Sequence, residues 1–123
     1  FEAVPEIITP YYVPESDTCS HLYVIRLAEE RLTCTRREFF DAMSERKVRC
    51  QVHYIPVYWF PYYKRLGYEK GLCPNAERVY SQIMSIPLFP KMTDEDVADV
   101  VEAVKETAGR YAKAIPMPEN ECN

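Results

Sequence analysis

The residues best suited to chemistry lie between Gln51 and Tyr63 (QVHYIPVYWFPYY), a stretch with one of the two histidines, the only tryptophan and four of the ten tyrosines. His53 and Tyr54 are adjacent, and an imidazole and a phenol can both donate hydrogen bonds to an anionic ligand. The alternative is that most of these aromatic side chains, Trp59 among them, pack against a sheet. The residues alone leave both interpretations open.

Two cysteine–histidine spacings raise the question of a zinc site, namely Cys19-x-His21 and Cys50-x-x-His53. Residues three apart on a strand point to opposite faces, so Cys50 and His53 would not bind the same ion. Cys19 and His21 could share a face, but a free cysteine is common in protein cores. We therefore expect no metal site.

Other catalytic patterns are also missing from the sequence. No spacing places a cysteine beside a histidine and a third orienting group. The acidic run Asp94–Asp96 fits the start of a helix better than a pair of catalytic carboxylates. Glycine occurs only at positions 67, 71 and 109, which excludes a glycine-rich phosphate loop. We expect no catalytic residue within this chain.

The composition is that of an ordinary globular domain, with 123 residues, 47% hydrophobic and 28% charged. The formal net charge of −4 disfavours nucleic acid and anionic lipid as partners. No stretch approaches the roughly 20 apolar residues of a membrane span, and no secretion signal is visible. The five cysteines are widely spaced, which indicates reduced thiols and a cytoplasmic protein. Because the chain begins without methionine, we expect it to be part of a longer protein.

The first half of the chain must provide the elements that position these residues. His21–Leu27 is nearly all apolar, β-branched or aromatic and predicts a strand buried on both faces. Thr35–Glu38 is a capping box that starts a helix running to about Lys47, with Phe39, Phe40 and Met43 on its apolar face. Val48–Ile55 predicts a second strand, which would end at the His53–Tyr54 pair.

The second half alternates helices with proline-rich turns. Pro61 and Gly67 suit the two ends of a short helix, in which Tyr62, Tyr63 and Leu66 would face inward. Pro74 opens another helix that reaches about Ile83. Ser85–Pro90 predicts a short edge strand, because its prolines cannot donate to a ladder. Thr93 caps a last helix that ends near Gly109, with an apolar stripe formed by Val97, Val100, Val101, Val104 and Ala108.

Apolar strands and striped helices together predict an α+β fold, in which a small sheet is covered by one layer of helices. We divide the chain into a leading segment at 1–18, which includes a short extended piece at Ile7–Val13, a domain at 19–110 and a loose tail at 111–123.

Six blocks occur in order along the chain. They are Ser20–Leu27 (SHLYVIRL), Gln51–Val57 (QVHYIPV), Tyr62–Tyr68 (YYKRLGY), Cys73–Glu77 (CPNAE), Ser85–Pro90 (SIPLFP) and Met92–Val97 (MTDEDV). Together they resemble the C-terminal domain of the DegT/DnrJ/EryC1/StrS family of sugar aminotransferases. They are most similar to members of spore coat polysaccharide and pseudaminic acid biosynthesis. The resemblance covers about residues 19–108.

The resemblance implies the C-terminal small domain of a fold-type-I enzyme that depends on pyridoxal phosphate (PLP), with a mostly antiparallel sheet. Such enzymes are homodimers that transfer an amino group from glutamate to a keto sugar nucleotide. Their N-terminal large domain binds PLP and carries the Schiff-base lysine. This chain lacks the glycine-rich segment that follows that lysine, and its own lysines stand in other contexts. We therefore expect the isolated chain to be inactive and to bind no PLP.

The resemblance also assigns the site residues. His53 and Tyr54 match the family's His-Tyr motif and are expected to contact the diphosphate or the sugar of the substrate. Arg26 and the Tyr58–Trp59 turn are further expected contacts. A free-standing α+β module that binds a ligand or regulates a partner is the alternative, and a zinc or thiol enzyme is a third possibility.

Overall fold

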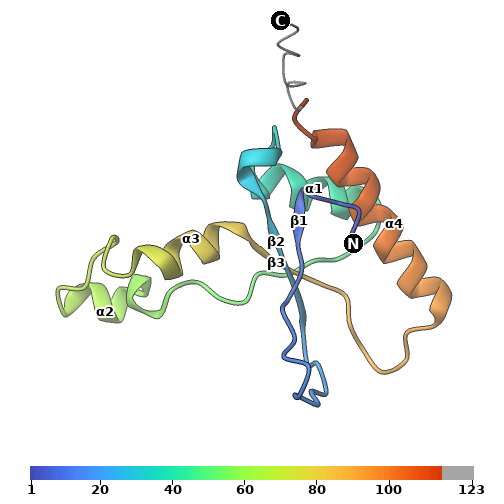
Figure 1. Ribbon diagram of the computed structural model, residues 1–123. Coiled ribbons are helices and arrows are strands. Elements are labelled where there is room, and N and C mark those ends of the chain that lie inside the picture. Colours follow the sequence, from blue (N-terminus) through green and yellow to red (C-terminus); the bar gives the residue numbers. More distant parts are fainter. Residues whose placement is uncertain (115–123) are drawn as a thin grey trace, which may run out of the picture.

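A three-stranded antiparallel sheet lies at the centre of the protein, whose computed structural model describes residues 1–114 (Figure 1). Its strands are β1 (Ile7–Ile8), β2 (Tyr23–Leu27) and β3 (Ile83–Ile86), in the order β1-β2-β3. Both pairings are antiparallel. The expected α+β architecture is confirmed. The strand β1 lies in the expected leading segment, and the expected tail lies outside the described residues from position 115 onward.

Two helices form the layer that covers the sheet. The helix α1 (Arg36–Glu45) follows a short 3-10 turn, η1 (Glu29–Arg31), and α4 (Asp94–Tyr111) is the last helix of the described chain. Both helices begin with the predicted threonine caps, each completed by an acidic side chain three residues later. The helices lie side by side and are joined by two exposed ion pairs, between Arg46 and Glu106 and between Arg110 and Glu45.

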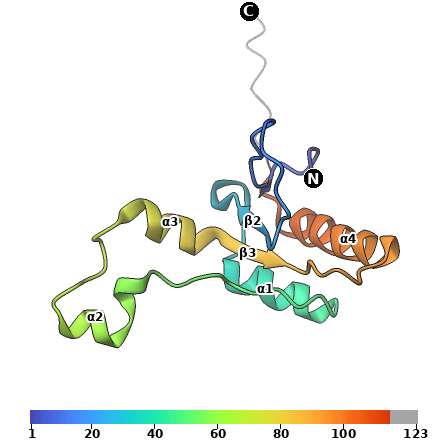
Figure 2. The same cartoon turned by 90° about the horizontal axis from the view of Figure 1, so that it is seen from below.

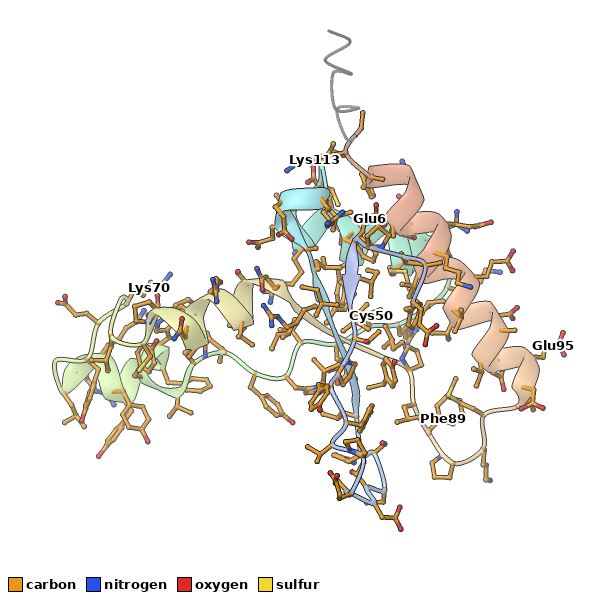
Figure 3. All side chains as sticks on the ribbon, viewed as in Figure 1. Glu6, Cys50, Lys70, Phe89, Glu95 and Lys113 are labelled. Atoms are coloured by element: carbon orange, nitrogen blue, oxygen red, sulfur yellow. The ribbon has the colours of Figure 1, made fainter. Side chains whose placement is uncertain are left out.

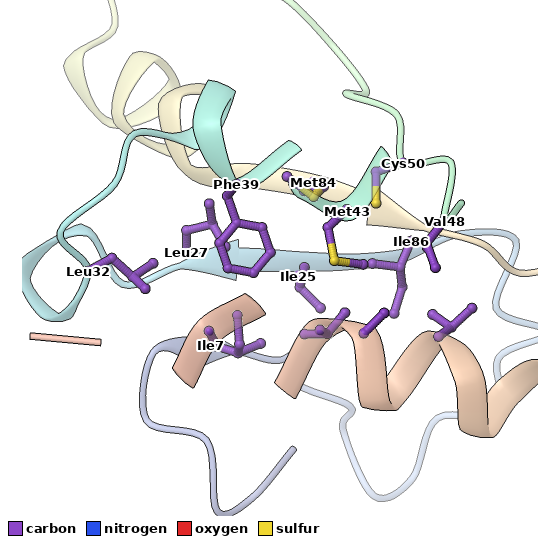
Figure 4. Close-up of a cluster of buried hydrophobic side chains, with 14 residues drawn as sticks. Ile7, Ile25, Leu27, Leu32, Phe39, Met43, Val48, Cys50, Met84 and Ile86 are labelled. Carbon is purple, nitrogen blue, oxygen red and sulfur yellow. The ribbon is translucent and has the colours of Figure 1, made fainter. Parts of the chain in front are cut away.

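The two faces of the sheet differ in what covers them. Residues paired across an antiparallel ladder project from the same face. The pair Ile25–Met84 lies on the face that packs against Phe39 and Met43 of α1 (Figure 4). Val104 of α4 belongs to the same core cluster. The next pairs along the ladder, Val24–Ser85 and Arg26–Ile83, therefore project from the opposite face. We call this opposite side the second face.

A long connecting segment separates α1 from β3. We call residues 56–82 the arm; it contains η2 (Val57–Trp59), α2 (Pro61–Arg65) and α3 (Pro74–Gln82). Figures 1 and 2 both show the arm extending from the sheet, away from α4. Gly67 has a φ of 90°, the left-handed conformation that was expected just after α2.

The predicted strand Val48–Ile55 is wrong. Val48 and Cys50 are buried, but the segment pairs with β3 only at Gln51, which exchanges two backbone hydrogen bonds with Ser85 (2.7 and 2.9 Å). The neighbouring strand is only four residues long and is followed at once by Pro87, so a longer ladder has no partner.

The prediction that Tyr62, Tyr63 and Leu66 face inward is also partly wrong. Tyr62 and Leu66 of the arm are each 59% exposed, because the core lies elsewhere, whereas Tyr63 is half-buried. In α4 the predicted stripe is confirmed except at Val97, which is 46% exposed, and the helix continues past Gly109. Within residues 1–114, no helix is long and apolar enough to cross a membrane.

Candidate functional site

His53 lies on the second face of the sheet, where a serine holds its ring. Its Nδ1 is 2.9 Å from Oγ of Ser85, and its ring lies edge-on to that of Tyr54 with centroids 4.7 Å apart. His53 is half-buried, whereas Tyr54 is 74% exposed. One edge of the imidazole is therefore anchored to the sheet, and Tyr54 lies against its ring.

Arg26 is held in the same way by a neutral side chain. Its Nε and Nη2 donate to Oε1 of Gln82 over 3.2 and 2.7 Å. Gln82 is buried at the end of α3, directly before β3. Within residues 1–114, Arg26 forms no ion pair. The same amide donates from Nε2 to Oε2 of Glu29 over 3.5 Å, so a carboxylate lies one side chain away from the half-buried guanidinium. Arg26 itself is fixed by a neutral amide and remains a charged donor for an anionic ligand.

The register of the sheet brings these predicted residues together. Arg26 pairs with Ile83 and Val24 pairs with Ser85, so Arg26 and Ser85 lie on one face as diagonal neighbours. The hydrogen bond from Ser85 then adds His53 and the adjoining Tyr54 to this face. The structure thus gathers all three predicted substrate residues on the second face, which α1 and α4 do not cover.

Sequence reasoning missed the two residues that hold the others, Ser85 and Gln82. Their partners lie 32 and 56 positions away along the chain, so no local spacing reveals them. The available signal is a polar residue at a buried position. Ser85 interrupts the apolar run of β3, and Gln82 directly precedes it.

The predicted Tyr58–Trp59 turn lies on the arm, where it has a structural partner. Glu77 of α3 accepts hydrogen bonds from the Tyr58 hydroxyl (2.7 Å) and from the Gly71 amide (2.6 Å). The hydroxyl of Tyr58 is the main cause that lowers the pKa of Glu77. Desolvation, followed by the same hydrogen bond, raises the pKa of Tyr58 to about 12. The ring of Trp59 contacts Lys70, whose Nζ is 4.3 Å from the ring centroid, and lies edge-on to the ring of Tyr80. These contacts join the segments of the arm to one another.

A cavity of about 740 Å³ lies between the start of α1 and the arm. Arg36 and Phe40 line it on one side, and Trp59 and Tyr80 line it on the other. The guanidinium of Arg36 is already engaged, because it donates to the carbonyl oxygen of Tyr80 and lies 4.7 Å from the centre of that ring. None of the three predicted substrate residues lines this cavity. They form an open surface, which could provide one wall of a larger site.

The residues considered for zinc are separated in the structure. Cys50 belongs to the core, where burial raises the pKa of its thiol to about 11, whereas His53 is bound to Ser85 on the second face. Cys19 is exposed, and the described residues contain no group of three potential metal ligands.

A model of the DegT/DnrJ/EryC1/StrS aminotransferase family matches residues 1–105. The chain belongs to this family. It is 40% identical over 108 residues to the spore coat polysaccharide biosynthesis protein SpsC of Bacillus subtilis, a match that covers 86% of this chain and 28% of SpsC. This chain therefore spans little more than a quarter of that relative.

Solved aminotransferases share the fold. Helicobacter pylori PseC, an aminotransferase of pseudaminic acid biosynthesis, superposes with a TM-score of 0.80 at 23% identity, over 90% of this chain and 29% of PseC. Spr1654 of Streptococcus pneumoniae in its PMP form gives 0.78 at 25% identity, over 88% of this chain and 27% of that protein. Spr1654 has also been solved in a PLP form, so PLP is a cofactor of that neighbour.

Proposed function

We propose that this chain is the C-terminal domain of a PLP-dependent aminotransferase that transfers an amino group from glutamate to a keto sugar nucleotide. Membership of the aminotransferase family supports the reaction class. The similarity to SpsC supports a role in the synthesis of polysaccharides or amino sugars. The complete enzyme would be a homodimer, as the family resemblance implies. Four free cysteines in the described residues favour the cytoplasm.

The residues of this chain do not fit PLP. A Schiff-base lysine needs a desolvated position beside the groups that hold the cofactor. All six lysines of the chain are exposed, and Figure 3 shows two of them, Lys70 on the arm and Lys113 beyond α4. The described residues also offer no glycine-rich cradle for a phosphate. The catalytic lysine and the cofactor site would belong to the part of the enzyme that this chain does not span.

The contribution of this chain would be to bind and orient the sugar nucleotide. The observation that carries this proposal is the presence of Arg26 and His53 on one face of the sheet, both held by neutral partners. A nucleotide diphosphate offers only acceptor oxygens and negative charge, which suits a guanidinium and an imidazole. Tyr54 adds an exposed phenol beside them. Orientation of this kind speeds a reaction without proton transfer from these residues.

The decisive experiment is His53→Ala in the full-length enzyme. Loss of a hydrogen bond to a charged phosphate should raise KM for the sugar nucleotide roughly tenfold or more, with KM for glutamate unchanged. His21→Ala is the matched control, because His21 is exposed and lies before β2. An unchanged KM for the sugar nucleotide in His53→Ala would count against the substrate contact.

A further inference from the structure

Ser85 is the only polar residue of β3, and it is buried, with 4% of its surface exposed. Its backbone N–H and C=O are both bound to Gln51. Its hydroxyl has one partner among the described residues, Nδ1 of His53 at 2.9 Å. The protonation of His53 therefore decides whether this buried hydroxyl can donate its proton.

The neutral imidazole can meet Ser85 in two ways. If Nδ1 carries the proton, it donates to Oγ, and the serine hydroxyl then has no acceptor within residues 1–114. A buried donor left unpaired costs about 1–3 kcal/mol. If Nε2 carries the proton, Ser85 donates to the bare Nδ1, and both groups are satisfied. The second arrangement is favoured.

The outward nitrogen then behaves in the same way in both charge states. In the neutral ring Nε2 carries the only proton. In the cationic ring Nδ1–H donates to Oγ of Ser85, and Nε2 keeps its proton. Nε2 has no hydrogen-bond partner among the described residues, since the contact of His53 with Ser85 uses Nδ1. It is thus a free donor on the same face of the sheet as Arg26.

We propose that Ser85 is a positioning residue of the sugar-nucleotide site, which fixes the tautomer of His53 so that Nε2–H always faces the substrate as a donor. This inference rests on the proposed function, in which His53 contacts the substrate. A phosphate oxygen accepts hydrogen bonds and donates none, so only the Nε2–H tautomer of the neutral ring can bind it. The other tautomer would place a lone pair against the anion.

The tautomer can be measured directly on this chain by 15N NMR of its two imidazoles, at a pH at which both are neutral. We expect a nearly pure Nε2–H signature for His53, with a pyridine-type shift at Nδ1. His21, which is exposed and has no hydrogen-bond partner among the described residues, should show averaged shifts and provides the internal reference. A His53 spectrum that matches His21, or one with the proton on Nδ1, would overturn the proposal.

Ser85→Ala should move the His53 shifts towards the averaged values of His21, whereas the exposed Ser44→Ala should leave them unchanged. The backbone amide spectrum reports whether each variant is folded. If Ser85→Ala does not fold, the tautomer of His53 in the wild-type chain still tests the proposal. In the full-length enzyme, Ser85→Ala should raise KM for the sugar nucleotide roughly threefold to tenfold, with kcat nearly unchanged.

The two proposals fail in different ways. If His53→Ala raises KM but the wild-type tautomer is mixed, the substrate contact stands and the role of Ser85 is refuted. If the tautomer is fixed but His53→Ala leaves KM unchanged, the pair is only structural, and both the substrate contact and the positioning role are refuted.

Discussion

Arg26 and His53 are each held by a neutral side chain rather than by a carboxylate. Gln82 binds the guanidinium and Ser85 binds the imidazole. A carboxylate in either place would form an ion pair and cancel much of the positive charge that faces a ligand. An amide or a hydroxyl fixes the geometry without that loss. This choice of partners distinguishes a binding surface from an internal salt bridge.

Gln82→Glu tests this interpretation at the scale of one residue. The new carboxylate would pair with Arg26 at nearly the same geometry, so we expect KM of the full-length enzyme for the sugar nucleotide to rise roughly fivefold or more. Asn75→Asp is the matched control, because it makes the same change of amide to acid at an exposed position of α3. Equal KM values for the two variants would argue against a substrate role for Arg26.

At the scale of elements, the arm depends on a few polar contacts, since it contributes no side chain to the core cluster. The contacts of Glu77 with Tyr58 and Gly71 join η2, the turn before α3 and α3 itself. Gly71 has a φ of 92°, a conformation that other residues adopt only with strain. The arm is therefore the part of the described structure most sensitive to loss of a single hydrogen bond.

We expect Tyr58→Phe to destabilise the arm and to leave the sheet with α1 and α4 folded. Trypsin should cut at Lys64, Arg65 or Lys70 roughly threefold to tenfold faster than in the wild type, because the open state is more populated. Tyr62→Phe is the control, since Tyr62 is exposed and forms no hydrogen bond within the described residues. Similar cleavage rates in both variants would show that Glu77 does not hold the arm.

The same contact has a predictable pH dependence. The hydrogen bond from Tyr58 is the main cause that holds the pKa of Glu77 below its ordinary value of 4.5. A lowered pKa means that the folded arm favours the carboxylate, so its contribution is complete above pH 4.5 and is lost as the pH falls through the lowered value. The protection of arm amides, corrected for the intrinsic exchange rate at each pH, should therefore fall on acidification before the protection of β2 amides does.

The elements that could be predicted from sequence are those set by neighbouring residues. The capping box at Thr35 and the threonine cap at Thr93 are local patterns, and both are present. The strand at 48–55 could not be judged locally, because a strand needs a partner of equal length and β3 is short. The prediction that one side of α2 faces inward was partly wrong for a related reason. A short amphipathic pattern does not reveal whether another element lies opposite the helix. His53 and Tyr54 stood out by type, but their support by Ser85 depends on tertiary structure.

At the scale of the whole molecule, many of the exposed large apolar side chains belong to one stretch of the chain. Seven large ones, all at 44% exposure or more, belong to the stretch from Tyr54 to Leu72: Tyr54, Val57, Phe60, Tyr62, Leu66, Tyr68 and Leu72. Exposed apolar clusters of this kind mark interaction surfaces. The chain spans 28% of the length of SpsC, and in the proposed enzyme the part that this chain does not span would be available to cover them.

In the proposed enzyme this chain does not hold PLP, which can be tested by adding PLP to the isolated chain. We expect no Schiff-base absorbance to remain after dialysis, because every lysine is exposed and lacks the surroundings that retain the cofactor. Exposed amines can form imines reversibly, so the sample should be reduced with borohydride and its mass measured. Scattered, substoichiometric labelling would agree with the proposal. One stoichiometric label, abolished by a single substitution such as Lys70→Arg, would show that this chain holds the cofactor itself.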